Sequence, residues 1–396
     1  MGKDPARKGL SRILAAACIC CLLYLSACQG DSAIAGPKPT PPATRGAAPA
    51  TATGTPQTGG AISMQVPGQH ATPTPKPKGK AKPAPGATAT LPAVAGNSNR
   101  PLLAFYYMWY NTSTWSLSTM SDLPTIKYNS SDTATIDRQL GWAANAGITG
   151  FISSWWGPGD QTDSNFAKLL SRSAALQQRT GYNFASSIYF ESDAPALQGE
   201  GNIVKGLLYI KSHYGNNPHF FHWQGKPVIF FWDPLGGGRS LTEWAAIRSQ
   251  VDPNDQMIWS AEGVNLDMLS VFDGIHLFSA GYWGLNNNDM AAVDEGFRNE
   301  INAYNSAHGT HKIWAAGVMP GYNDTRVPGR TGTFIVPRNN GATYQESWQG
   351  ALASSPDWVT ITSFNEWFEG AMIEPSVTYG SLYLNLTQRF AYQWEG

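Results

Sequence analysis

Eight short apolar runs recur along the last three quarters of the sequence, and polar or amphipathic segments separate them. Each run is almost continuously hydrophobic rather than alternating, which is typical of parallel strands buried on both faces. The runs span residues 102–110, 149–156, 184–191, 227–233, 257–262, 274–280, 312–318 and 358–364.

Helical periodicity fills most of the gaps between these runs. Segment 135–146 places Ile136, Leu140 and Ala143 on one face and ends before Gly147, a common residue after a helix. Similar segments span 163–180, 203–213, 240–250, 289–307, 344–352 and 379–394, and a short helix fits between residues 262 and 274. Eight strand–helix units predict a single (β/α)8 TIM barrel of the α/β class. The alternative is an open doubly wound sheet, but no glycine-rich phosphate loop follows the first run to support it.

The first 98 residues differ from the rest in composition. Residues 1–28 combine a basic start, a short apolar stretch and a final Leu-Ser-Ala-Cys28, which resembles a bacterial lipobox. We therefore expect a lipoprotein signal peptide, lipidation of Cys28, and export to the outer face of the bacterial membrane; a plain cleaved signal and a secreted protein are the alternative. Residues 29–98 hold 13 of the 27 prolines and no Trp, Tyr or Phe, which predicts a disordered Pro/Thr/Ala-rich linker.

Residues 99–396 form the predicted catalytic domain. They carry 17 Lys and Arg against 26 Asp and Glu, a formal net charge of −9 that argues against nucleic acid as a partner. All four cysteines lie within residues 1–28, so neither disulfides nor thiol chemistry are expected in this domain. All 15 tryptophans lie in it, which favours an oligosaccharide or polysaccharide partner because indole rings stack on sugar C–H surfaces. We expect a monomer.

Acidic and aromatic residues gather where the predicted strands end. In a (β/α)8 barrel this rim holds the active site, and acids with aromatic platforms but no cationic cluster are typical of a neutral-sugar site. Trp155 and Trp156 are adjacent in the sequence, and one of them is expected to pack in the core. The candidate substrate-binding residues are Tyr107, Trp155, Trp156, Glu191, Asp233, Tyr282, Tyr322 and Asn365.

Glu366 and Glu369 follow the last apolar run. Cleavage of a glycosidic bond usually needs two carboxyl groups, one as proton donor and one as nucleophile or base. In one pocket, burial and mutual repulsion would push their pKa values apart and assign those roles. The alternative is a surface turn with two solvated acids. No His-Glu-x-x-His or Gly-x-Ser-x-Gly motif occurs, and no metal or cofactor is expected.

The sequence Asn365-Glu-Trp-Phe-Glu-Gly370, followed by Ile-Glu-Pro375, resembles the Asn-Glu-Trp-His-Glu-Gly…Ile-Glu-Pro motif of glycoside hydrolase family 99, the endo-α-mannosidases and endo-α-1,2-mannanases. Segments 105–110, 154–157 and 319–326 also look like that family. The resemblance implies a barrel that cleaves with retention of configuration. Glu366 would deprotonate the sugar 2-hydroxyl, which attacks the anomeric carbon to give a 1,2-anhydro sugar, and Glu369 would act as general acid and then base. Phe368 stands where the family carries His, which leaves the sugar specificity open.

The function expected from these features is that of a retaining, endo-acting α-mannosidase-type glycoside hydrolase working on glycans outside the cell. One alternative is a glycosyltransferase-like or transglycosylating polysaccharide enzyme, since proteins of polysaccharide gene clusters carry a similar motif. Another is a non-catalytic glycan-binding lipoprotein, against which the intact acid pair argues.

Overall fold

The computed structural model describes residues 99–283 and 289–396. The predicted signal peptide, the linker and Cys28 lie outside these residues. Eight parallel strands pair in the ring β1-β2-β3-β5-β6-β7-β8-β11, and β11 pairs with β1 to close it. The strands are β1 (Leu102–Tyr106), β2 (Gly150–Trp155), β3 (Ser187–Glu191), β5 (Lys226–Trp232), β6 (Ile258–Glu262), β7 (Gly274–His276), β8 (Ile313–Val318) and β11 (Trp358–Ile361). The predicted (β/α)8 barrel is confirmed.

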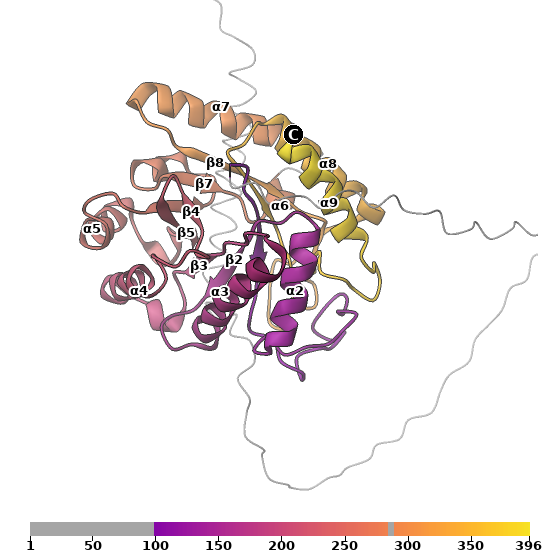
Figure 1. Cartoon of the computed structure of the whole chain (residues 1–396). Helices are drawn as coiled ribbons and strands as arrows, with labels where there is room; N and C mark the ends of the chain where they lie inside the picture. Colours follow the sequence, from indigo (N-terminus) through magenta and orange to yellow (C-terminus); the bar gives the residue numbers. More distant parts are fainter. Residues whose placement is uncertain (1–98, 284–288) are drawn as a thin grey trace, which may run out of the picture. The chain divides into compact units, whose positions relative to one another are not determined.

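The helices lie around the ring of strands (Figure 1). Gly147 follows α2 with a φ of 82°, the left-handed conformation expected of a glycine after a helix. The short helix predicted between the fifth and sixth apolar runs is the 3-10 turn Leu266–Ser270. The α-helices are α2 (Thr133–Asn145), α3 (Gln161–Thr180), α4 (Glu200–His213), α5 (Leu241–Val251), α6 (Ala280–Trp283), α7 (Met290–His308), α8 (Ala342–Ala353) and α9 (Leu382–Glu395).

Successive residues of each strand enter two different cores, because strand side chains alternate between faces. One core fills the barrel: the ring centroid of Phe230 on β5 lies 5.7 Å from that of Trp358 on β11, although these strands are not neighbours. The other core lies between strands and helices and includes Phe231 together with Ile247 of α5. Polar residues at the strand ends therefore face the inside of the barrel mouth when they lie on the same face of the strand as the interior residues.

Two features extend beyond the eight predicted units. The strand β4 (His222–Trp223) pairs antiparallel with β5 and precedes it. After β8, the strands β9 (Tyr322–Asn323) and β10 (Ile335–Val336) form an antiparallel hairpin at the carboxyl end of the barrel. Within the part of the chain that the structure describes, no helix has the length and apolar character needed to cross a bilayer.

Candidate active site

Five carboxyl groups lie at the carboxyl ends of the barrel strands. Glu191 ends β3, Glu262 ends β6 and Asp233 directly follows β5. Glu366 and Glu369 lie in the loop after β11, where the Ala371 N–H donates to the Glu366 carbonyl over 3.2 Å and closes a turn. Burial raises the pKa of the Tyr107 hydroxyl, and the nearby charges of Glu366, Glu191 and Glu369 raise it further, so these groups lie in one cluster.

Glu366 is the most sheltered acid of this cluster, with 3% of its surface exposed. Its Oε1 accepts a hydrogen bond from the Phe368 N–H at 3.1 Å and lies 3.3 Å from the Tyr110 hydroxyl. Burial raises the pKa of the Glu366 carboxyl well above its usual value, and the nearby charge of Glu369 raises it further. A solvated surface turn, the alternative considered from the sequence, does not describe this residue.

Glu369 has a different environment, because its side chain is 16% exposed and forms an ion pair. Arg330 Nη1 donates to Glu369 Oε1 over 2.8 Å. The other carboxylate oxygen, Oε2, is buried without a hydrogen-bond partner among the described residues. The two acids are thus chemically unequal, as a pair that divides acid and base roles requires.

Asn365 does not lie free for a substrate, contrary to its predicted binding role. The residue is fully buried. Its Oδ1 accepts the Tyr107 N–H at 2.7 Å, while its Nδ2 donates to the Tyr107 carbonyl at 2.9 Å and to the Tyr128 hydroxyl at 3.2 Å. Its side-chain amide therefore joins the acid-bearing loop to the chain after β1. The hydrogen bonds from Asn365 thus hold Tyr107 in place next to Glu366.

A second internal brace supports the same loop through Glu374. Its carboxylate accepts hydrogen bonds from Gln139 Nε2 at 2.7 Å, from the Tyr128 hydroxyl at 2.9 Å and from Trp367 Nε1 at 3.0 Å. Burial raises the pKa of Glu374 to about 7, which these donors partly oppose. Because Trp367 lies between Glu366 and Glu369, this brace holds the peptide that spaces the two acids.

Glu191 and Trp156 meet on the β2–β3 side of the site. Ser154 donates to Glu191 Oε1 over 2.6 Å, and Trp156 Nε1 donates to Ser154 Oγ over 3.1 Å. Burial raises the pKa of Glu191 to about 8, with a further contribution from Glu369. The half-buried Trp156 ring packs edge-on against Trp109, with 5.9 Å between ring centroids. This group supplies both a protonatable acid and an aromatic surface.

Trp155 occupies a different place from the one predicted for a substrate-binding residue. Its side chain is fully buried in the core between strands and helices, and its Nε1 donates to Asp163 Oδ1 of α3 over 2.9 Å. Because side chains alternate along β2, Trp155 points away from the barrel interior that Ser154 faces. Of the adjacent tryptophans, Trp155 is the core residue and Trp156 is the candidate for the site.

Asp233 and Glu262 lie together at the ends of β5 and β6, next to the end of β3. Burial raises the pKa of Glu262 to about 8, and the neighbouring charge of Asp233 adds to the effect. Burial likewise raises the pKa of Asp233, with Asp193 as the second cause. Asp193 itself pairs with Arg239 at 2.7 Å. The positions of Asp233 and Glu262 thus agree with the predicted cluster of acids.

Tyr282 and Tyr322 border the site from the α6 segment and the β9–β10 hairpin. The Tyr322 ring stacks on Phe334, with centroids 4.4 Å apart and planes at 10°, and Tyr282 packs edge-on against the same ring at 5.4 Å. The Tyr322 hydroxyl accepts a hydrogen bond from Arg330 at 3.0 Å. Tyr322 is therefore linked to Glu369 through one guanidinium group.

His276 of β7 lies in the interior of the protein. It is fully buried, its Nδ1 lies 3.0 Å from Ser260 Oγ, and its Nε2 lies 3.4 Å from the Tyr189 hydroxyl. Burial lowers the pKa of His276 to about 3, so the ring is neutral at physiological pH. Within residues 99–283 and 289–396, no three His, Cys, Asp or Glu side chains are grouped so that they could hold a metal ion.

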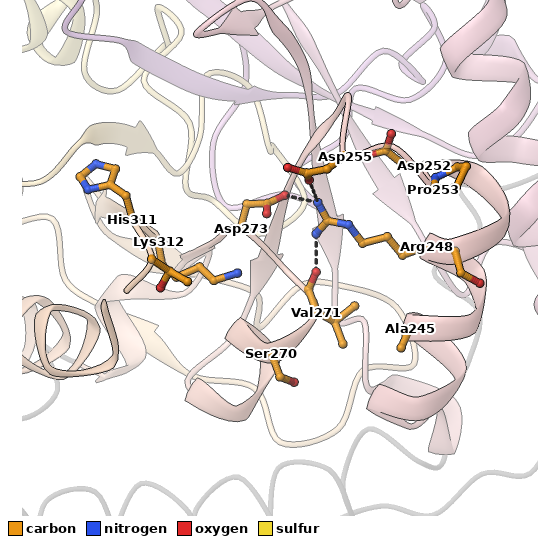
Figure 2. Close-up of a pocket in the computed structure, with 12 residues that line it drawn as sticks. Ala245, Arg248, Asp252, Pro253, Asp255, Ser270, Val271, Asp273, His311 and Lys312 are labelled. Atoms are coloured by element: carbon orange, nitrogen blue, oxygen red, sulfur yellow. Dashed lines mark hydrogen bonds and ion pairs between the residues drawn. The ribbon is translucent and has the colours of Figure 1, made fainter. Parts of the chain in front are cut away.

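A cavity of about 680 Å³ lies at the other end of the barrel, where the strands begin (Figure 2). Its central cation, Arg248, pairs with Asp255 at 2.8 Å and with Asp273 at 2.9 Å, and also donates to the Val271 carbonyl. Asp273 immediately precedes β7, so this network joins elements at the amino-terminal face, which serves stability in (β/α)8 barrels. The candidate active site is therefore the acidic rim and not this cavity.

Residues 119–387 match the model of glycosyl hydrolase family 99. This chain belongs to that family. Glycoprotein endo-alpha-1,2-mannosidase of Mus musculus is 24% identical over 275 residues, covering 65% of this chain and 58% of the mouse protein. The glycoprotein endo-alpha-1,2-mannosidase-like protein of Homo sapiens is 24% identical over 285 residues, with 67% and 62% covered. The chain spans less than two thirds of the length of either relative.

Solved structures agree with the fold of this family 99 protein. The GH99 endo-alpha-mannosidase from Bacteroides thetaiotaomicron superposes with a TM-score of 0.61 at 21% identity, covering 76% of this chain and 98% of that chain. A protein described as glycoside hydrolase-like superposes with a TM-score of 0.57 at 16% identity, covering 76% and 97%. At these identities the likeness shows the barrel architecture alone.

Arg330 and Tyr110 contact the two candidate acids, although neither is among the candidate residues that the sequence predicted. Tyr110 is fully buried, 3.3 Å from the Glu366 carboxylate, and also accepts the Trp367 N–H at 3.0 Å. The sequence signalled Tyr110 only as part of an aromatic run. Arg330 lies 39 residues before Glu369 in a loop without periodicity, so no local pattern marks it.

Proposed function

We propose that this protein is a retaining, endo-acting glycoside hydrolase that cleaves α-mannosidic bonds in glycans or polysaccharides outside the cell. The observation that carries the proposal is the cluster of Glu366, Glu369 and Tyr107 at the carboxyl end of the barrel. Membership of family 99 supports the reaction class. The activities named for the relatives, endo-alpha-1,2-mannosidase and endo-alpha-mannosidase, support the substrate class.

In this proposal Glu366 is the base that removes the proton from the sugar 2-hydroxyl. Its shelter and its hydrogen bond from the Phe368 N–H suit a carboxylate that must approach one oxygen at a defined angle. The 2-hydroxyl oxygen then attacks the anomeric carbon to give a 1,2-anhydro sugar. Because burial raises the pKa of Glu366, the acid limb of kcat/KM should lie above pH 4.5, the ordinary value for a glutamate.

Glu369 is the proposed general acid that protonates the leaving glycosidic oxygen and then the base that activates water. Trp156, Tyr107 and Tyr282 are proposed to contact the sugar rings, and Glu191 is proposed to bind a sugar hydroxyl beside them. Phe368 offers an aromatic edge next to the reacting sugar. We further propose that export and lipidation at Cys28 place the enzyme on the outer face of the membrane.

The experiment that tests the proposal compares Glu366→Gln and Glu369→Gln with the unaltered protein on a panel of α-mannans, α-glucans and bacterial polysaccharides. Product size and anomeric configuration are read by chromatography and NMR. Each variant should lose about 10²–10⁴-fold in turnover while still binding the glycan. Glu295→Gln, an exposed acid on α7, is the matched control and should keep full activity. Full activity in either site variant would contradict the proposed roles.

The same panel separates the alternatives. Products longer than the supplied oligosaccharide would indicate a transglycosylating or glycosyltransferase-like enzyme. A different result would indicate a non-catalytic glycan-binding lipoprotein: the unaltered protein binds glycan but cleaves no substrate, and Trp156→Ala abolishes the binding.

A further inference from the structure

The β9–β10 hairpin lies directly against the loop that carries Glu369. The Asn323 N–H donates to the Glu369 carbonyl over 2.7 Å. The next residue, Gly370, has a φ of 59°, and a Cβ there would come within 3.1 Å of the Asn323 carbonyl oxygen and 2.5 Å of Ser121 Oγ. A glycine is required for this close approach. The hairpin is thus built to hold the main chain of the acid.

Arg330 extends this contact to the Glu369 side chain. Its Nη1 lies 2.8 Å from Glu369 Oε1, 3.1 Å from Asp324 Oδ2 and 3.0 Å from the Tyr322 hydroxyl. Asp324 is 3% exposed, and its Oδ1 accepts the Phe334 N–H at 2.9 Å. Arg330 therefore has a buried counter-ion of its own. The guanidinium stays charge-compensated whether Glu369 is ionised or neutral.

The two oxygens of Glu369 are left in different states by this arrangement. Oε1 is held by the guanidinium, whereas Oε2 is buried with no hydrogen-bond partner among the described residues. A neutral carboxyl group still has one acceptor oxygen, so the bond from Arg330 to Oε1 can persist when Oε2 carries a proton. An unpartnered buried oxygen costs free energy unless a ligand satisfies it.

We propose that Arg330 is a positioning residue for proton transfer, which holds Oε1 of Glu369 so that Oε2 is the oxygen that donates and recovers the proton. This inference rests on the proposed function. In the first step the Oε2–H proton moves to the glycosidic oxygen as its bond to the anomeric carbon breaks, and the leaving sugar departs as an alcohol. In the second step the water oxygen attacks the anomeric carbon and gives a proton to Oε2, while the bond from that carbon to O2 breaks. Glu366 returns to O2 the proton it took in the first step, so both carboxyl groups regain their starting states.

The test uses two α-mannosides that differ only in the leaving group, a glycan whose leaving group is a sugar and the corresponding glycosyl fluoride. Fluoride departs without protonation, so only the sugar-linked substrate needs a well-placed acid. The kcat/KM values of Arg330→Gln and Arg330→Lys are measured on both. Arg326→Gln is the matched control, since Arg326 lies in the same hairpin loop but donates to the Leu117 and Met120 carbonyls and not to Glu369.

Arg330→Gln should lower kcat/KM at least 100-fold on the sugar-linked substrate and less than tenfold on the fluoride, and Arg330→Lys should recover part of the loss. Arg326→Gln should change neither value more than about twofold. Equal losses on both substrates, or no loss, would overturn the positioning role. If Arg330→Gln does not fold, as judged by circular dichroism, the ratio measured for Arg330→Lys decides. Absence of cleavage of either substrate by the unaltered protein would overturn the proposed function, and with it this inference.

Discussion

Replacing Asn365 with alanine should destabilise the protein strongly, because this side chain joins two segments of the chain inside the site. Asn365 makes three hydrogen bonds, two of them to the N–H and the carbonyl of Tyr107, and it is fully buried. Alanine would leave both Tyr107 groups without a partner, at about 1–3 kcal/mol each. We expect the free energy of unfolding to fall by about 3–5 kcal/mol, a large part of the 5–15 kcal/mol typical of a domain.

The assay is urea unfolding followed by tryptophan fluorescence, since all 15 tryptophans lie in the folded part of the sequence. Asn323→Ala is the matched control. That side chain accepts from Thr325 N–H at 3.2 Å and Thr325 Oγ1 at 2.6 Å in an exposed turn, where water replaces it. The control should lose less than about 1 kcal/mol. A loss of unfolding free energy for Asn365→Ala no greater than that of the control would refute the reasoning that the Asn365 hydrogen bonds hold the site together.

Three further outcomes are expected. Asp294 of α7 is fully buried, neither carboxylate oxygen has a partner among the described residues, and burial raises its pKa. Asp294→Asn should therefore stabilise the protein by about 1–3 kcal/mol at pH 7. The difference in urea midpoint between the variant and the unaltered protein should shrink toward pH 4. Because the pKa of Glu262 is raised to about 8, the stability that its neutral form contributes is complete below pH 4.5 and is lost as the pH rises through 8. Glu262→Gln should remove that part of the pH dependence, and an unchanged slope of stability against pH would contradict this. Trp155→Phe should lower the melting temperature without changing KM, whereas Trp156→Phe should raise KM with little change in melting temperature; the reverse result would exchange their assigned places.

Much of the fold followed from local sequence patterns. Apolar runs and helical periodicity predicted the eight strands, and the runs end within one residue of the strands for β2, β3, β5, β6 and β8. The β9–β10 hairpin was missed because each of its strands has two residues, too short to show a period. Placing acids at strand ends also placed them at the carboxyl rim, since all strands of the ring run parallel.

The site could be predicted only as far as neighbouring residues determine it. In a strand buried on both faces, the hydrophobic pattern does not distinguish inside from outside. The sequence therefore could not decide which of Trp155 and Trp156 leaves the core. Asn365 presented the same difficulty, because an amide beside two acids looks like a ligand until its partners at Tyr107, 258 positions away, are known.

The sequence by itself determined the kind of protein: a barrel of eight strand–helix units whose last strand leads to two glutamates three residues apart, in a motif of family 99. Those are local properties of the chain, and they can be read from the periodicity and spacing of neighbouring residues. Only the tertiary structure decided that Glu366 is buried while Glu369 pairs with Arg330. It also decided that Oε1 of Glu369 has a hydrogen-bond partner while Oε2 has none within the described part of the chain. The pairing of β8 with β11 brings the hairpin after β8 against the loop after β11. Contacts of that kind cannot be read from the pattern of either segment alone.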